Sequence, residues 1–107
     1  MAELQDLTIE VTQADIDAGR KESCDSCPIA LAALRVVPVL DPYQLIDVQM
    51  DRIRLGTYNH ELAGDLGFWR LPPEARHFIA AFDADPRSRV DLALIAPFTF
   101  IAKAVAP

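Results

Sequence analysis

The chain is organised around the stretch SCDSCPIALAAL, from Ser23 to Leu34. Ser26 is a good N-cap residue, and Pro28 is tolerated in the first turn of a helix because its missing N–H would have no partner there. Apolar residues follow almost without interruption, so we expect a helix that is buried on nearly every side and ends before Pro38. Its expected apolar stripe comprises Cys27, Ala30, Leu31 and Leu34, and Ile29, Ala33 and Val36 cover much of the rest.

Two elements are expected before this helix. Residues Leu7 to Val11 (LTIEV) alternate apolar and polar side chains, which is typical of a half-buried strand. Thr12 and Asp15 then have the spacing of a capping box, which predicts a short helix from Gln13 to Ala18. Gly19 occupies the place of its C-terminal cap.

After the central helix, Asp41–Tyr43 (DPY) is expected to turn. Alternating residues then predict a strand over residues 46–50. The apolar residues change parity at Asp51-Arg52, which indicates either a tight hairpin or a bulge; we favour the hairpin, followed by a second strand. Residues Gly56 to Trp69 show no clear period and are expected to form an ordered loop.

The clearest helix of the chain opens with LPPE at Leu71. Its apolar residues Ala75, Phe78, Ile79 and Phe82 follow the spacing of one helix face. One bent strand or two short ones are expected over residues 90–94 and 98–100. The predicted order is β-α-α-β-β-α-β, which indicates an α+β fold with a mostly antiparallel sheet packed by helices. We expect one small domain over residues 1–107, with frayed ends at about 1–5 and 103–107.

Net charge and composition limit the classes of molecule that the protein is expected to bind. The 107 residues carry a net charge of −6 with no Lys/Arg cluster, which disfavours direct binding to nucleic acid. Such a charge suits a basic or nucleic-acid-binding protein as partner; the alternative is that it only keeps a small domain in solution. No apolar run is long enough to span a membrane, and the acidic N-terminus lacks the apolar region of a signal peptide. We therefore expect a cytoplasmic protein.

The cysteines invite a chemical interpretation. Cys24 and Cys27 form a CxxC pair at a helix start, where the helix dipole favours a thiolate. Cys27 also belongs to the apolar stripe, so a structural role competes with a redox or zinc role. A zinc site would need His60 and His77 as further ligands, and their spacing differs from that of zinc fingers. We assign no metal and no cofactor.

No hydrolase, phosphate-loop or dinucleotide motif occurs in the sequence, so we do not expect an enzyme. Phe68, Trp69 and Arg70 follow two glycines and are residue types enriched at interface hot spots, which makes them the candidate binding site. The competing interpretation is that Trp69 covers one end of the core.

The segments TIEVTQADIDAG, CPIALA, LPPEARHFIAAFD and PFTF together resemble an uncharacterised family of small proteins of bacteriophages and bacteria. The resemblance covers most of the chain, except for extra residues at about 87–95, and it implies no catalytic residue. It implies a phage or bacterial protein, in the host cytoplasm if phage-encoded.

Together these observations predict a protein that acts by binding another protein, and in a narrower version an acidic inhibitor of a host nucleic-acid-binding enzyme. A thiol or zinc protein using Cys24 and Cys27, and a self-associating structural module, are the alternatives.

Overall fold

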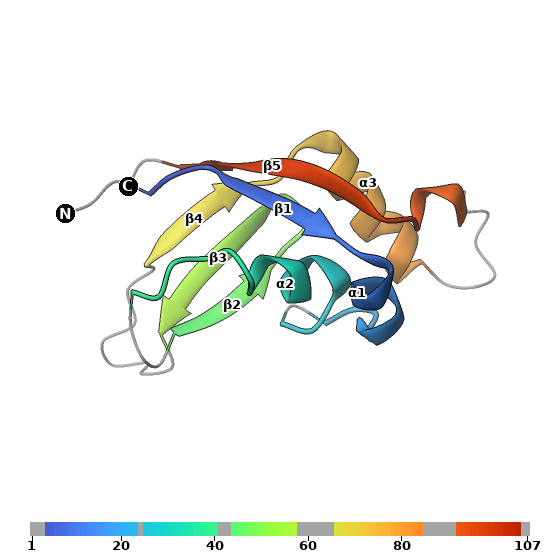
Figure 1. Ribbon diagram of the computed structural model, residues 1–107, viewed down its shortest axis with the longest axis horizontal. Helices are drawn as coiled ribbons and strands as arrows, with labels where there is room; N and C mark the ends of the chain where they lie inside the picture. The colour runs from blue at the N-terminus through green and yellow to red at the C-terminus, as the bar shows by residue number, and fades with distance from the viewer. Residues whose placement is uncertain (1–3, 24, 41–43, 58–65, 85–91, 106–107) are drawn as a thin grey trace.

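The computed structural model describes residues 4–23, 25–40, 44–57, 66–84 and 92–105. Within them, strands and helices follow one another in the order β-α-α-β-β-β-α-β, an α+β arrangement (Figure 1). The elements are β1 (Leu7–Val11), α1 (Gln13–Ala18), α2 (Pro28–Ala33), β2 (Gln44–Val48), β3 (Arg52–Thr57), β4 (Gly67–Arg70), α3 (Pro73–Asp83) and β5 (Phe98–Ala104). A short 3-10 helix, Leu92–Leu94, precedes β5.

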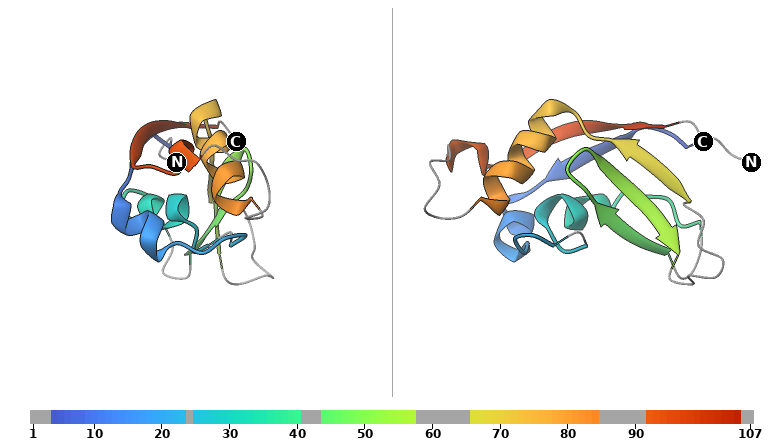
Figure 2. Two further views of the ribbon diagram at one scale, coloured as in Figure 1. Left: turned by 90° about the vertical axis from the view of Figure 1, so that its right-hand side faces the viewer. Right: turned by 180° about the vertical axis from the view of Figure 1, so that it is seen from behind.

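The strands form one antiparallel sheet in the order β1-β5-β4-β3-β2. Strand β5 pairs with β1 along most of its length, and with β4 only at its C-terminal end, through Lys103 and Ala104. The sheet is curled, as the end-on and rear views of Figure 2 show. This topology leaves β1 and β2 as the two edges of the sheet.

The core fills the inner side of the curled sheet. Alternate strand residues point inward and are buried: Leu7, Ile9, Val11, Ile46, Val48, Ile53, Leu55, Trp69, Phe100 and Ala102. Helix α2 contacts both edge strands and adds Ile29, Ala30, Ala32 and Ala33. Helix α3 adds Ala75, Phe78, Ile79 and Phe82. The apolar faces of the strands, with their period of two, and of the helices, with their period of 3.6, therefore pack together in one core.

Several sequence predictions are confirmed, including the α+β class. Strand β1 and helix α1 have the expected bounds, and Thr12 and Asp15 form the capping box: Asp15 N–H donates to Thr12 Oγ1 at 3.2 Å and Thr12 N–H donates to Asp15 Oδ2 at 2.9 Å. Helix α3 buries all four residues of its predicted face. Strands β2 and β3 form the expected hairpin.

Two predictions near the end of the sheet are wrong. The segment expected to be a loop contains β4, a strand of four residues whose period is hidden because Gly67 has no side chain and Phe68 and Trp69 are adjacent. At Leu92–Leu94 the chain forms a 3-10 helix, whereas a strand was expected there. The alternation of residues 90–94 is too short to distinguish the two, and residues 90 and 91 lie outside the described part.

The central helix is shorter than predicted. Its N-cap is Cys27, whose Sγ accepts a hydrogen bond from Ala30 N–H at 3.4 Å; Ser26 was expected in this position. After Ala33, backbone hydrogen bonds join residues three apart, as in a 3-10 helix, so the turn is tighter than in an α-helix. The following side chains therefore no longer lie on the buried face of α2. Leu34 is consequently 53% exposed and Val36 is also at the surface, although both were expected to be buried.

The remaining differences are small. The hairpin turns at Met50-Asp51, one residue earlier than expected, because Gln49 N–H bonds to Arg52 C=O at 2.8 Å. Strand β5 continues through Lys103 to Ala104, where we expected the ordered part to have ended. The predicted turn at residues 41–43 lies outside the described residues.

Candidate protein-binding surfaces

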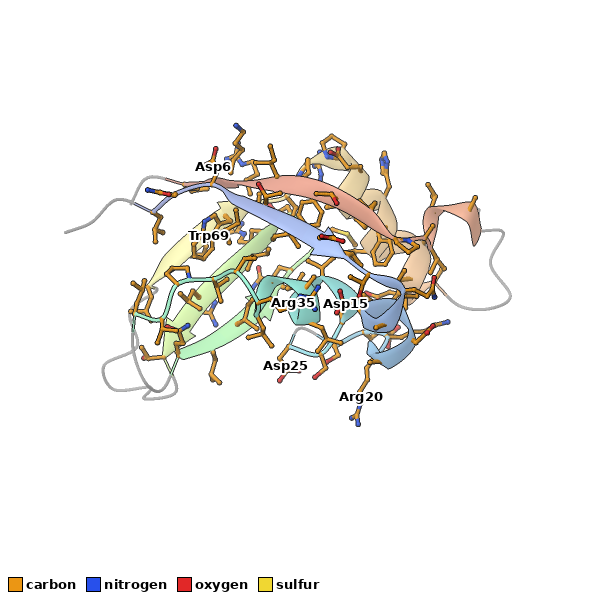
Figure 3. All side chains as sticks on the ribbon, viewed as in Figure 1. Asp6, Asp15, Arg20, Asp25, Arg35 and Trp69 are labelled. Carbon is orange, nitrogen blue, oxygen red and sulfur yellow. The ribbon has the colours of Figure 1, made fainter. Side chains whose placement is uncertain are left out.

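Trp69, a predicted contact residue, belongs to the core. Its side chain is 0% exposed, and its Nε1–H donates to the backbone oxygen of Gln5 at 2.9 Å (Figure 3). The indole points inward because Trp69 has the parity of the buried strand residues and pairs with Ile53. The burial of Trp69 agrees with the competing interpretation, in which its side chain covers the core.

Its two neighbours in β4 lie on the outer side of the sheet. Phe68 is half-buried, and the guanidinium carbon of Arg52 lies 5.7 Å from the centre of its ring, a cation–π arrangement. Arg70 is exposed. Of the predicted trio, Phe68 and Arg70 thus remain as surface residues.

The residues that the alternative zinc site would need are not brought together within the described part of the chain. Cys27 is buried at the start of α2, whereas His77 is exposed on α3. Cys24 and His60 lie outside the described residues. Within those residues, no group of three or more His, Cys, Asp or Glu side chains is placed to hold a metal ion.

The two edges of the sheet differ in their surroundings. Near β1, Arg35 from the turn after α2 donates to the backbone oxygen of Glu10 at 2.8 Å and forms a two-pronged pair with Asp15, with both bonds at 2.7 Å. These bonds tie β1, α1 and α2 together (Figure 3). The β1 edge therefore has a side chain bonded to its backbone.

Strand β2 presents open backbone at the other edge. Gln49 forms a hydrogen-bonded pair with Arg52. In an antiparallel pair, hydrogen-bonded and non-hydrogen-bonded positions alternate, so Asp47 also bonds to β3. Ile46 and Val48 lie at the alternate positions and turn their N–H and C=O groups away from β3. Among the residues that the structure describes, none bonds to these outward groups of Ile46 or Val48. Such groups are a template for a further strand.

Two depressions follow this edge. The first has a volume of about 430 Å³ and the second about 260 Å³. The first is lined by Asp25, Leu34 and β2 residues 44–47, and the second by Glu22, Ser23, Cys27, residues 48–50, Ile79 and Asp83. We call the β2 edge with both depressions the edge groove. The described residues that line it include four carboxylates and neither Lys nor Arg.

Sequence reasoning could not have found the edge groove. It predicted β2 as a strand, but its neighbours Leu34 and Asp83 are brought beside it only by the fold. The exposed apolar residue Leu34 was instead assigned to the core. The only signal in the sequence was the excess of acidic residues.

No known protein family, curated protein or solved structure matches this chain. The resemblance to small phage and bacterial proteins therefore stays a prediction. None of the helices in the described part of the chain is long and apolar enough to cross a membrane.

Proposed function

We propose that this protein binds another protein by taking up an extended segment of it alongside β2, in the edge groove. The observation that carries the proposal is the outward backbone of Ile46 and Val48 at the open end of the sheet order. An added strand would satisfy these N–H and C=O groups, and main-chain bonds of this kind supply affinity in strand-addition complexes.

The lining of the edge groove defines the chemistry of the partner segment. Asp25, Glu22 and Asp83 favour lysine or arginine side chains, while Leu34 and Ile79 favour apolar ones. The fourth carboxylate, Asp47, is already paired with Arg54 at 3.5 Å. Side chains of a strand alternate, so the segment that fits best alternates basic and apolar residues. A second copy of this chain fits less well, because its own β2 edge is acidic and each copy carries a net charge of −6.

The proposal includes the setting expected from the sequence. In this setting the protein is cytoplasmic, is of phage or bacterial origin, and acts on another protein without catalysing a reaction. Recognition through main-chain hydrogen bonds is compatible with such a role, because it needs no catalytic residues. An unfolded or flexible basic region of a nucleic-acid-binding protein would have the composition that the edge groove favours.

A labelled peptide of alternating lysine and valine tests this mode by fluorescence anisotropy. We expect it to bind, and we expect Leu45→Lys to weaken binding by about tenfold, because a new cation at the edge repels the peptide. The matched control is Ile101→Lys on β5: both side chains are about half exposed, at 51% and 49%, and the change in charge is the same. This control should alter affinity by no more than about twofold.

Two further peptides separate strand addition from simple charge attraction. One has proline in place of its central valines, which removes backbone donors, and the other is an all-lysine peptide of equal length. Both should bind at least about tenfold more weakly than the alternating peptide. Equal binding of either peptide contradicts strand addition at β2.

A further inference from the structure

The outer side of the sheet concentrates positive charge in an acidic protein. Four of the ten Lys and Arg residues of the chain lie there around one aromatic ring. We call this set the arginine face: Arg52, Arg54, Phe68, Arg70 and Lys103. Strands β3, β4 and β5 bear it, and in Figure 2 the rear view presents β3 and β4 toward the reader.

Strand register sets three of these cations in a row. Arg52 is paired with Arg70 across β3 and β4, and Arg70 is paired with Lys103 across β4 and β5. Neighbouring strands are about 4.8 Å apart, so the row spans roughly 10 Å. Arg70 therefore has a cation on each side.

The three other cations of the arginine face each have a carboxylate partner already. Arg52 pairs with Asp51 at 3.2 Å, Arg54 with Asp47 at 3.5 Å and Lys103 with Asp6 at 3.2 Å. Arg70 has no ion pair with any residue in the described part of the chain. Like charges on directly opposite strand positions are destabilising, so a carboxylate placed over Arg70 would relieve repulsion on both sides.

Neighbouring groups orient and extend this charge. The ring of Phe68 fixes the guanidinium of Arg52 above it. The pKa of Asp51 lies below its usual range because of its hydrogen bond to Arg52, with a smaller contribution from the charge of Arg76 on α3.

We propose that the arginine face is a second binding surface, which holds an acidic segment of a protein with a carboxylate over Arg70. Exposed Val105 and Ile101 near its rim suit apolar side chains of such a segment. A nucleic acid fits less well, because Asp6, Asp47 and Asp51 are interspersed and the net charge of −6 repels an extended polyanion. The surface is opposite in charge to the edge groove.

Anisotropy titrations with labelled octaglutamate, labelled oligo(dT) and the lysine–valine peptide test this proposal. Octaglutamate should bind, and Arg70→Glu should weaken it by at least about tenfold. Arg20→Glu changes the net charge equally, at an exposed residue of the α1–α2 loop that points away from the molecule in Figure 3, and should weaken it by no more than about threefold. Arg70→Gln, which retains a polar side chain, should fall between wild type and Arg70→Glu.

Three results would overturn the proposal: octaglutamate fails to bind, Arg20→Glu and Arg70→Glu weaken it equally, or oligo(dT) binds more tightly than octaglutamate. Retained binding of the lysine–valine peptide by Arg70→Glu would show that the variant is folded and that the two surfaces act separately. If the lysine–valine peptide does not bind in the edge groove, the octaglutamate titration still tests the arginine face, because the two peptides have opposite charge.

Discussion

At the scale of single residues, the pair of Asp15 and Arg35 is the best-defined polar contact. The Asp15 side chain is 6% exposed and that of Arg35 is 49% exposed. Hydrogen bonds from Arg35, and further ones from Thr12, lower the pKa of Asp15 from 3.8 to about 2. Because Asp15 caps α1 while Arg35 also bonds to β1, this carboxylate links three elements.

This pair predicts a dependence of stability on pH. The folded pKa of Asp15 is depressed, so its contribution is complete above the unfolded value of 3.8 and is lost as pH falls toward about 2. Asp15→Asn should lower the free energy of unfolding at pH 7 by less than ~2 kcal/mol, because Arg35 is half exposed and solvent screens the pair. Urea titrations at pH 7 and pH 2.5 should show the difference from wild type shrinking.

The control for this prediction is Asp17→Asn, at an exposed aspartate of the same helix. It removes one charge without touching Arg35. If Asp15→Asn remains equally destabilising at pH 2.5, the effect comes from packing and the electrostatic explanation is wrong.

At the scale of elements, the close approach of Gly19 to Pro28 joins α1 to α2. Gly19 has an ordinary negative φ of −68°, so its lack of a side chain matters for space alone. A Cβ there would lie 2.5 Å from Pro28 Cδ. Gly19 N–H also bonds to Asp15 C=O at 2.8 Å and ends α1.

Gly19→Ala should therefore push the two helices apart. We expect a loss of about 1–3 kcal/mol in the free energy of unfolding, the usual range for overpacking. Gly56→Ala is the matched control, because its Cβ would meet nothing closer than Arg54 Cζ at 4.0 Å, and it should change stability by less than ~0.5 kcal/mol. Chemical denaturation of both variants makes the comparison; equal losses would contradict the steric argument.

Element prediction succeeded where local signals were strong. The capping box at Thr12 and the long apolar period from Ala75 to Phe82 were sufficient for α1 and α3. Strand β4 lacked such a signal, and it exists because β3 and β5 bond to both of its sides. Phe68 and Arg70 were found as surface candidates from composition, but their neighbours Arg52 and Lys103 come from other strands.

At the scale of the whole molecule, the fluorescence of Trp69 is a probe for the unfolding of the core. It is the single tryptophan, it is fully buried, and it ties Gln5 to β4. Since one core connects all strands with α2 and α3, we expect unfolding to be cooperative. Transitions in urea followed by tryptophan emission and by far-UV circular dichroism should coincide; separate midpoints would indicate that the sheet does not unfold as one unit.

The sequence by itself determined what depends on near neighbours: the alternation of β1 to β3, the cap of α1, the apolar face of α3 and the net charge. These rest on residues a few positions apart. Only the tertiary structure decided that Trp69 is buried, that β2 has an open edge beside four carboxylates, and that Arg70 lies between Arg52 and Lys103. Strand register and edge position come from pairings between distant segments, which no local pattern encodes.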